Sequence, residues 1–497
     1  MTATLASLIA EVAARGAGRA AVRLDERVLS FGELDDLTAR VAGLVTEAGL
    51  RPGDRVGVMV PNVPEFLVTY YGVLRAGGVV VPMNVMLKRR EVAFYLGDSG
   101  AQLLFHWHGC ADEAIAGAEE VGCRAVEVDP DRFAALLGGC EPQAPVEVEP
   151  DAAAEILYTS GTTGLPKGAV LTHRGLIENA RIAGEDILLL DADSIVLGVL
   201  PLFHASGQTL GMNATMFKGG CLTLQPRFDP GAALGIIERD RVTHFQGVPT
   251  MYITLLHHPG REGFDVSSLR NCVVGAAAMP EDVLHGFEEA FGCSVYEGYG
   301  LSEASPLATF NHPGRPNKVG SIGTPLAGVE VKVFDDEDRE VPTGEIGELV
   351  IRGHNVMKGY WERPEETAEA LRGGWLHTGD MAREDADGYF LIVDRKKEVI
   401  IRGGYNVYPR EVEEVLYEHP QVREAAVIGL SDERLGEEVG AVVVLLPGAV
   451  LEPAELREFV KARLAAYKYP RQVWFVDELP KGPSGKILKR EIDRPAV

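Results

Sequence analysis

The most informative segment of this chain is the run Tyr158-Thr159-Ser160-Gly161-Thr162-Thr163-Gly164-Leu165-Pro166-Lys167-Gly168. Short apolar stretches on either side, at 155–158 and 168–172, predict two strands joined by a polar loop. The glycines let backbone N–H groups turn toward an anion, the hydroxyls can donate to phosphate oxygens, and the lysine adds a positive charge. This composition indicates a cradle for the phosphates of a nucleoside triphosphate, with a plain polar hairpin as the simpler alternative. The loop is not of the Walker type, because Gly168 follows the lysine where Ser or Thr is required.

The length and composition of the chain limit its architecture. With 497 residues it is too long for one core, so we expect at least two domains. Its hydrophobic fraction of 46% and charged fraction of 24% are typical of a soluble globular protein. The net charge of −25 argues against a nucleic-acid-binding protein, which needs a basic face. An anionic ligand is still compatible with this charge, because the local field depends on nearby residues.

The cysteines and the N-terminus bear on where the protein works. The six cysteines show no Cys-x-x-Cys spacing and predict free or buried thiols in a reducing compartment, so we expect a cytoplasmic protein. The first 15 residues lack a basic start, and Glu11 interrupts their apolar run, which indicates an amphipathic helix and no signal peptide. We expect no transmembrane segment, because no run of 18 apolar residues occurs.

Hydrophobic periodicity predicts an α/β fold with mostly parallel sheets. Ser30-Phe-Gly-Glu33 has the pattern of a capping box at the start of a helix. Strands then alternate with helices, with strands expected at 56–60, 79–81 and 102–105 and helices at 66–74 and 91–96. Residues 319–353 carry short strands punctuated by Gly and Pro. The last 100 residues predict a small α+β unit with helices at 411–416 and 453–466 and strands at 425–429, 441–446 and 472–476.

Several further motifs follow the polar loop in order. They are Gly275-Ala-Ala-Ala-Met-Pro280, Tyr296-Glu-Gly-Tyr-Gly-Leu-Ser-Glu303, Trp375-Leu-His-Thr-Gly-Asp380, the charged run 393–404 and Pro483-Ser-Gly-Lys486-Ile. Small residues after a strand, as at 275–280, leave room for a flat ring, although close packing of a helix on a sheet also favours them. A charged run between two apolar strands is typical of a solvated linker.

Together with the polar loop, these motifs resemble those of the adenylate-forming enzymes, a superfamily of acyl-CoA synthetases, peptide-synthetase adenylation domains and luciferases. The resemblance extends over nearly the whole chain. It implies a large N-terminal domain of mixed parallel sheets flanked by helices, with a small β-barrel, at residues 1–394. A small, mobile α+β domain at 395–497 would act as a lid and carry Lys486.

The resemblance also implies a nucleotide site. Its members would be Thr159, Ser160, Gly161, Thr162, Thr163, Gly164, Lys167, Gly275, Ala276, Ala277, Glu297, Gly298, Tyr299, Gly300, Ser302, Asp380, Arg395 and Lys486. Tyr299 would stack on adenine, Asp380 and Arg395 would contact the ribose, and Ser302 would line the phosphates. Glu303 would hold Mg²⁺, a hard cation that prefers oxygen ligands. The implied catalytic residues are Lys486, His204, Thr163 and Glu303.

The same resemblance assigns an acyl pocket to His204, Gly207, Gly247, Gly298 and Leu301, with His204 as a gate beside the reacting carboxylate. The simpler alternative for His204 is a histidine in a turn. Lys397 would be the pivot of the hinge between the domains. Gly403 and Gly404 would lie on the side where CoA enters.

These residues predict an ATP-dependent acyl-CoA synthetase that uses ATP, Mg²⁺ and CoA and forms an acyl-AMP intermediate. The small or apolar pocket positions favour a medium- or long-chain fatty acid, with an aryl acid of the coumarate type as the alternative. Phe245-Gln-Gly-Val-Pro249 offers no aspartate for the ammonium group of an amino acid.

The acceptor of the acyl group has its own alternatives. An acyl-AMP ligase that loads a carrier protein is one, but the short connection 361–378 leaves no room for the extra segment of such enzymes, which favours CoA. A non-catalytic adenylate-binding module and a luciferase-like monooxygenase are the others. Lys486 argues against the first, and no oxygen-activating group supports the second. We expect small-molecule partners, no nucleic acid and a possible homodimer.

Overall fold

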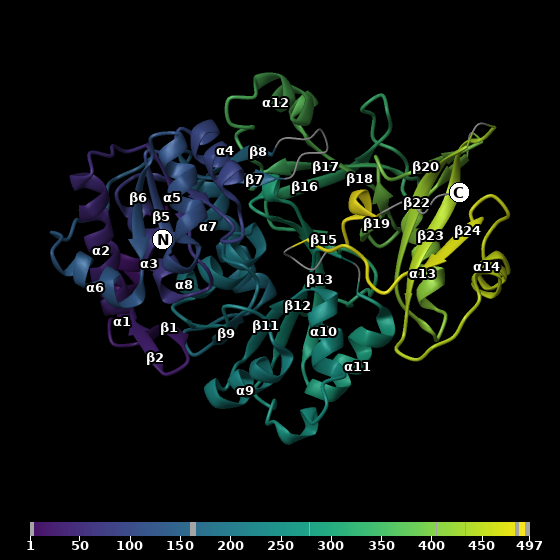
Figure 1. Ribbon diagram of the computed structural model, residues 1–497, viewed down its shortest axis with the longest axis horizontal. Helices are drawn as coiled ribbons and strands as arrows, with labels where there is room; N and C mark the ends of the chain where they lie inside the picture. Colours follow the sequence, from purple (N-terminus) through teal and green to yellow (C-terminus); the bar gives the residue numbers. More distant parts are fainter. Residues whose placement is uncertain are drawn as a thin grey trace. The chain divides into compact units, whose positions relative to one another are not determined.

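The computed structural model describes residues 4–159, 166–277, 279–403, 405–432, 434–482 and 487–492, with the side chain of Arg490 left out. The chain forms two compact units. Unit 1 comprises Met1–Val331 and Ile351–Leu376, and unit 2 comprises Lys332–Val350 and His377–Val497. Figure 1 labels the helices and strands.

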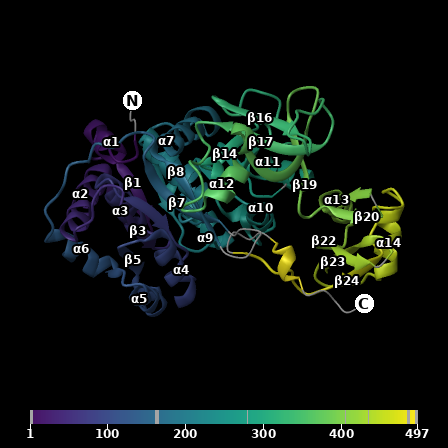
Figure 2. The same ribbon diagram turned by 90° about the horizontal axis from the view of Figure 1, so that it is seen from above.

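The first large sheet of unit 1 has six strands. Their order is β6 (Arg124–Val128), β5 (Leu103–Trp107), β3 (Arg55–Met59), β4 (Val79–Pro82), β7 (Ala153–Thr159) and β8 (Lys167–Thr172). All neighbours are parallel except β7 and β8, which form an antiparallel pair. Helices α4 (Arg89–Ser99) and α5 (Ala111–Glu120) pack on this sheet (Figure 2) and share a buried core with it. The predicted strands on either side of the polar loop are thereby confirmed.

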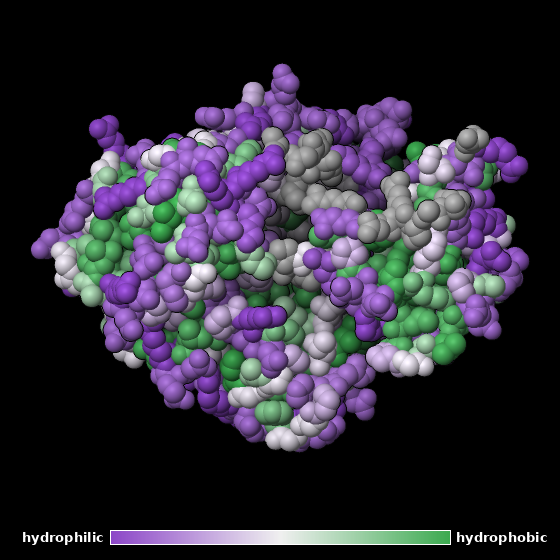
Figure 3. All heavy atoms as spheres, in the orientation of Figure 1, coloured by the Kyte–Doolittle hydropathy of each residue, from purple (hydrophilic) through white to green (hydrophobic). Residues whose placement is uncertain are grey.

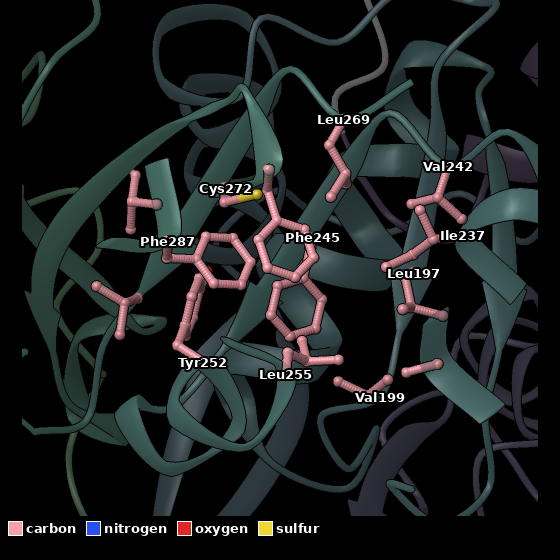
Figure 4. Close-up of a cluster of buried hydrophobic side chains, with 14 of the residues drawn as sticks. Leu197, Val199, Ile237, Val242, Phe245, Tyr252, Leu255, Leu269, Cys272 and Phe287 are labelled. Carbon is pink, nitrogen blue, oxygen red and sulfur yellow. The ribbon is translucent and has the colours of Figure 1, made fainter. Parts of the chain in front are cut away.

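The second large sheet has nine strands. Their order is β15 (Thr324–Pro325), β14 (Leu307–Phe310), β13 (Ser294–Gly300), β12 (Asn271–Val274), β11 (His244–Gly247), β9 (Ile195–Gly198), β10 (Cys221–Leu224), β1 (Ala20–Leu24) and β2 (Arg27–Ser30). Its centre, from β13 to β1, is parallel. Helices α9 (Pro230–Asp240), α10 (Pro249–Leu256) and α11 (Glu281–Phe291) cover one face. Figure 4 shows Phe245, Tyr252, Cys272 and Phe287 meeting in the core beneath them.

Helix α3 (Pro64–Arg75) packs against α2 and against strands of both large sheets, β1 and β3. Every one of its residues is buried, and its two charged residues, Glu65 and Arg75, form ion pairs with Arg27 and Asp35. Helix α2 (Phe31–Glu47) begins at the predicted capping box, in which the Ser30 hydroxyl accepts from the Glu33 N–H. The remaining helices of unit 1 are α1 (Leu8–Gly16), α6 (Pro130–Gly138), α7 (His173–Ile182), α8 (Ala214–Lys218) and α12 (Pro364–Ala370).

Two segments of unit 1 are π-helical, η2 (Ala183–Ile187) and η3 (Gly207–Asn213). Such helices are rare and occur most often at functional sites. Segment η3 begins three residues after His204 and packs against β9 and β11. The sequence of η3 carries no pattern that distinguishes a π-helix from an α-helix.

Two smaller sheets are built mostly from residues of unit 2. A four-stranded sheet orders β16 (Val329–Phe334), β17 (Gly347–Gly353), β18 (Leu376–Glu384) and β19 (Phe390–Arg395), where a small β-barrel was expected. The other sheet orders β21 (Tyr405–Val407), β20 (Ile400–Arg402), β23 (Gly436–Leu445) and β22 (Val422–Asp432), with β24 (Gln472–Phe475) parallel to β23. Helices α13 (Pro409–Tyr417) and α14 (Pro453–Lys461) share a buried core with this sheet.

The predicted α/β fold, with a large unit of parallel sheets and a small C-terminal unit built on an antiparallel sheet, is confirmed. All six cysteines are free thiols, as expected. Within the described residues, no helix is both long and apolar enough to cross a membrane. Hydrophilic side chains cover much of the face drawn in Figure 3, in keeping with the net charge of −25. The predicted domain boundary at 394 and 395 concerns a movement and stays a prediction.

Candidate active site

The candidate site starts where β7 ends and β8 begins, at the end of their hairpin that the predicted phosphate loop connects. Thr159 and Lys167 are paired across this hairpin. The loop between them, at 160–165, lies outside the described residues. The predicted roles of Ser160, Gly161, Thr162, Thr163 and Gly164 therefore stay predictions, as does that of Lys486, which also lies outside.

Glu303 joins three segments at this end of the hairpin. Its Oε1 atom accepts a hydrogen bond of 3.2 Å from the Thr159 hydroxyl and one of 3.0 Å from the Tyr360 hydroxyl. Burial raises the pKa of Tyr360, and the nearby carboxylate of Glu303 raises it further. The phenol therefore keeps its proton and remains a donor. One oxygen of Glu303 is thus held in place beside the predicted phosphate loop.

Tyr360 is a site residue that our sequence analysis missed. The segment around it runs along β8, where the Trp361 N–H donates to the Gly168 carbonyl at 2.7 Å. The ammonium of Lys167 lies 5.4 Å from the centroid of the Tyr360 ring, within the range of a cation–π contact. The motif Lys358-Gly-Tyr-Trp361 was visible in the sequence, but nothing in it indicated a partner for Glu303.

The turn after β12 has the open geometry that a flat ring would need. A Cβ added to Gly275 would find only the Gly298 carbonyl within 4 Å, at 3.5 Å. Ala276 and Ala277 are exposed, and Ala276 has a φ of 67°. Glu297 supports this turn, because its carboxylate accepts from the N–H groups of Met279 at 3.3 Å and Gly320 at 2.8 Å.

Strand β13 carries the remaining residues of the predicted adenine site. Tyr299 is half-buried and pairs with Thr309 of β14. Gly300 admits no side chain, since a Cβ there would lie 2.1 Å from the Pro306 carbonyl oxygen. Ser302 and Glu303 follow in a single turn of 3₁₀-helix. The structure thus places Thr159, Tyr299, Glu303 and the turn at 275–277 in unit 1.

His204 lies just before η3 with its imidazole largely enclosed. Its Nε2 atom is buried and has no hydrogen-bond partner among the described residues. Burial lowers the pKa of His204, so the ring is neutral near pH 7. A neutral imidazole with a vacant ring nitrogen is available to a substrate group.

The glycines predicted to line the acyl pocket have no free space beside them where a side chain would begin. A Cβ at Gly207 would lie 2.4 Å from the Pro201 carbonyl, and one at Gly247 would lie 2.9 Å from the Phe245 ring. A Cβ at Gly298 would collide with the Phe310 ring at 2.0 Å. These glycines can therefore line a site only through their backbone.

Two glutamines that sequence analysis passed over stand next to these glycines. Gln208 follows Gly207 and is 0% exposed, and Gln246 precedes Gly247 and is 2% exposed. The Gln246 amide makes no hydrogen bond within the described part of the chain, whereas the Gln208 amide interacts with the buried carboxylate of Glu155. Gln246 could have been noticed in the sequence, because a glutamine is unusual in a buried strand. The direction of its side chain could not be predicted, because it depends on the strand register.

Unit 2 holds the predicted ribose-binding pair. Asp380 in β18 stands opposite Arg395 in β19, and its Oδ1 atom lies 3.4 Å from Nε of Arg395. The Asp380 N–H donates to the Thr378 hydroxyl at 3.1 Å. Lys397 is exposed in the turn after β19, and Gly403 is exposed with a φ of 58°. Gly404 lies outside the described residues.

No three metal-ligating side chains come together in the described segments. Mg²⁺ does not require such a group, because it commonly takes one or two carboxylates together with substrate phosphates. Glu303, fixed by Thr159 and Tyr360, fits that role as a single carboxylate beside the phosphate loop.

Two profiles of known protein families match the chain, one over its larger N-terminal part and one near its C-terminus. A family profile described as "AMP-binding enzyme" matches residues 9–361. A second, described as "AMP-binding enzyme C-terminal domain", matches residues 411–486. The two matches follow one another in the order that the sequence motifs predict.

Known proteins resemble the chain over nearly its full length. A long-chain-fatty-acid–CoA ligase of Bacillus subtilis (strain 168) is 39% identical over 525 residues, covering 98% of this chain and 94% of its own. A feruloyl-CoA synthase of an Amycolatopsis species is 42% identical over 478 residues, covering 95% of each chain. The crystal structure of ATP-bound MatB from Rhodopseudomonas palustris superposes with a TM-score of 0.92 at 33% identity, covering 98% of this chain and 97% of its own.

Proposed function

Since this chain belongs to the AMP-binding enzyme family, we propose that it is an AMP-forming ligase that joins a carboxylic acid to CoA with the use of ATP. The observation that carries the proposal is the cluster of Thr159, Glu303 and Tyr360 beside the predicted phosphate loop. Two relatives that each cover almost the whole chain are named for the formation of CoA thioesters, which supports CoA as the acceptor.

In the first half-reaction an oxygen of the carboxylate attacks the α-phosphorus of ATP. A carbon–oxygen–phosphorus bridge forms, and pyrophosphate leaves with the electron pair of the broken bond. The acid is already ionised near pH 7, so this step needs no general base. The chain's task is to position the reactants and to stabilise the charge that spreads over the phosphate oxygens.

We propose roles in that task for the residues of the predicted nucleotide site. Thr159, Lys167 and the loop between them would contact the phosphates, and Lys486 would add its ammonium in the transition state. Glu303 would hold Mg²⁺, which supplies positive charge to the phosphate oxygens. Tyr299 and the turn at 275–277 would receive adenine, and Asp380 with Arg395 would bind the ribose.

In the second half-reaction the thiol sulfur of CoA attacks the carbonyl carbon of the acyl-adenylate. The thioester bond forms, AMP leaves with the bridging oxygen, and the thiol proton passes to solvent. We propose that residues 395–497 turn about Lys397 between the two steps and bring Gly403 and Gly404 to the CoA side, a gating movement of a kind common in enzymes.

The acid has two candidates. The fatty-acid candidate comes from the sequence and agrees with the relative from Bacillus subtilis. The aryl-acid candidate agrees with the feruloyl-CoA synthase, and the buried amide of Gln246 favours a polar tail. His204 would stand beside the reacting carboxylate in either case.

The proposed function is tested by a screen for pyrophosphate release. Acids from C4 to C18 and a set of aryl acids are offered with ATP and Mg²⁺, with and without CoA. We expect at least one acid to release pyrophosphate, with a CoA thioester as the final product. Release of ADP, or no thioester from any acid, would contradict the proposal.

A further inference from the structure

Gln246 is a buried side chain whose amide has no hydrogen-bond partner in the part of the chain that the structure describes. It lies in β11 and is 2% exposed. Neither its amide nitrogen nor its amide oxygen makes a hydrogen bond within the described residues. Protein interiors rarely leave such groups unpaired, because the loss of hydration is then uncompensated.

The strand register places Gln246 on the face of the sheet that carries Gly298, one of the residues predicted for the acyl pocket. Gln246 stands opposite Val273 in β12, and Val273 stands opposite Tyr296 in β13. Because side chains alternate along a strand, Gly298 lies on the same face as Tyr296. Phe245 and Cys272 point the other way, into the core beneath α10 and α11 (Figure 4).

A direct contact connects Gln246 with the segment that follows His204. A Cβ added to Gly211 would lie 2.2 Å from the Gln246 Nε2 atom, so the amide rests against the backbone of η3. The same segment begins just after His204, whose Nε2 atom is also buried without a partner. The two vacant polar groups therefore flank one segment, the π-helix η3.

We propose that Gln246 determines the specificity for the acid and that the preferred acid carries a neutral hydrogen-bonding group, such as a hydroxyl, on its tail. This inference rests on the proposed function. The hydroxyl would donate to the amide oxygen or accept from the amide nitrogen when the acid is bound. An acid that ends in a methyl group would leave the amide unpaired.

The charge of the surroundings argues for a neutral group. Among the described residues, Arg75 is the one buried arginine, and no lysine is buried. Arg75 is occupied by Asp35 and by the carbonyl of Gln143. Within the described part of the chain, a second carboxylate on the tail of the acid would therefore find no buried, unoccupied lysine or arginine to pair with, and an unpaired buried charge is strongly unfavourable.

The test compares matched pairs of acids that differ in one hydroxyl, namely 4-hydroxycinnamate with cinnamate and 8-hydroxyoctanoate with octanoate. The kcat/KM for CoA-dependent AMP formation is measured for each. For the pair that the enzyme uses better, we expect the wild-type protein to favour the hydroxylated acid by roughly tenfold or more, since a site built to hydrogen-bond a hydroxyl discriminates strongly against its absence.

In Gln246→Leu, the ratio of kcat/KM for the hydroxylated acid to that for its partner should fall to about one. Gln246→Met, which conserves more of the side-chain volume, should show the same ratio and serves as the test if the leucine variant folds poorly. Gln225→Leu is the matched control, because Gln225 is also a buried glutamine of unit 1, bonded to the Asp229 carbonyl at 3.1 Å. That control should keep the wild-type preference. A general loss of activity lowers kcat/KM equally for both acids of a pair, so it does not change their ratio.

The outcomes separate this inference from the proposed function. If thioesters form but wild-type and Gln246 variants show the same ratio, Gln246 has no part in specificity and a buried water satisfies its amide. A wild-type preference for cinnamate or octanoate over the hydroxylated partner would also overturn the inference. If no acid of the panel or of the wider screen yields a thioester, the proposed function itself fails.

Discussion

At the scale of single residues, Glu303 depends on two hydroxyl donors for its position. The Tyr360 hydroxyl contributes one of them at 3.0 Å. Thr159 contributes the other from the end of β7 at 3.2 Å. Removing either donor should disturb the step that uses ATP more than the step that does not.

Tyr360→Phe tests this dependence with the loss of one oxygen atom. A hydrogen bond to a charged acceptor contributes about 1.5–3 kcal/mol, and the half-exposed setting reduces this, so we expect a roughly tenfold slower release of pyrophosphate. Thioester formation from supplied acyl-AMP and CoA is the internal control and should stay near the wild-type rate. Equal losses in both half-reactions would mean that Tyr360 only stabilises the fold.

Glu155 is a second residue with a measurable property of its own. It is fully buried in β7, its Oε2 atom accepts from the Tyr70 hydroxyl at 3.1 Å, and burial raises the pKa of Glu155 from 4.5 to about 8. Between these two pH values the folded protein keeps a proton that the unfolded chain has released. The free energy of unfolding therefore falls as the pH rises through this range, by up to about 1.4 kcal/mol per pH unit for one proton.

Glu155→Gln removes this titration and keeps an amide of similar shape in its place. We expect the wild-type Tm to fall more steeply than that of Glu155→Gln between pH 6 and pH 8. Thermal unfolding followed in the same buffers checks this. Parallel Tm curves over that range would show that Glu155 is ionised throughout in the folded protein.

At the scale of elements, the register of β11 determines which of its side chains face the core and which face η3, and the residue composition of the strand does not. We assigned the predicted acyl pocket to Gly247, but Gly247 faces the core beneath α10 and Gln246 faces η3. A shift of one residue moves a side chain to the opposite face of a sheet, and the sequence of a four-residue buried strand gives no alternation from which to read the face. The π-helical form of η3 escaped prediction for a related reason, since no local residue pattern marks it.

Lys486, which lies outside the described residues, is proposed to act in the first half-reaction alone. Lys486→Ala should slow pyrophosphate release by roughly 100-fold or more, the effect of removing one charge that stabilises the transition state. Thioester formation from supplied acyl-AMP should be spared. If both half-reactions fall together, Lys486 is not specific to the first.

Making the turn after β19 rigid should impair the second half-reaction and spare the first, the reverse of the result expected for Lys486→Ala. Lys397→Pro fixes φ at about −65° and should hold residues 395–497 in one orientation. We expect pyrophosphate release to survive while transfer to CoA falls. Lys397→Ala, which leaves the turn free to move, is the control and should retain both steps. Unaltered transfer in the proline variant would remove Lys397 as the pivot.

At the scale of the whole molecule, the order of motifs was sufficient to predict the family and the α/β architecture. Glycines, hydroxyls and charges at fixed spacing specify backbone shape and ligand chemistry locally, so they can be read without the fold. The support of Glu303 by Tyr360 could not be read, because the two residues are brought together by the pairing of the 358–361 segment with β8. Side-chain partners that are distant in sequence are fixed only by tertiary structure.

The proposed reaction passes through an acyl-adenylate, and oxygen labelling can detect this intermediate. The acid is supplied with ¹⁸O in both oxygens of its carboxylate, together with ATP, Mg²⁺ and CoA. The ¹⁸O content of each product is then measured by mass spectrometry. We expect one ¹⁸O atom in each AMP formed and none in pyrophosphate, because the carboxylate oxygen that attacked the α-phosphorus leaves with AMP. Unlabelled AMP, or label in inorganic phosphate formed with ADP, would contradict the proposed reaction.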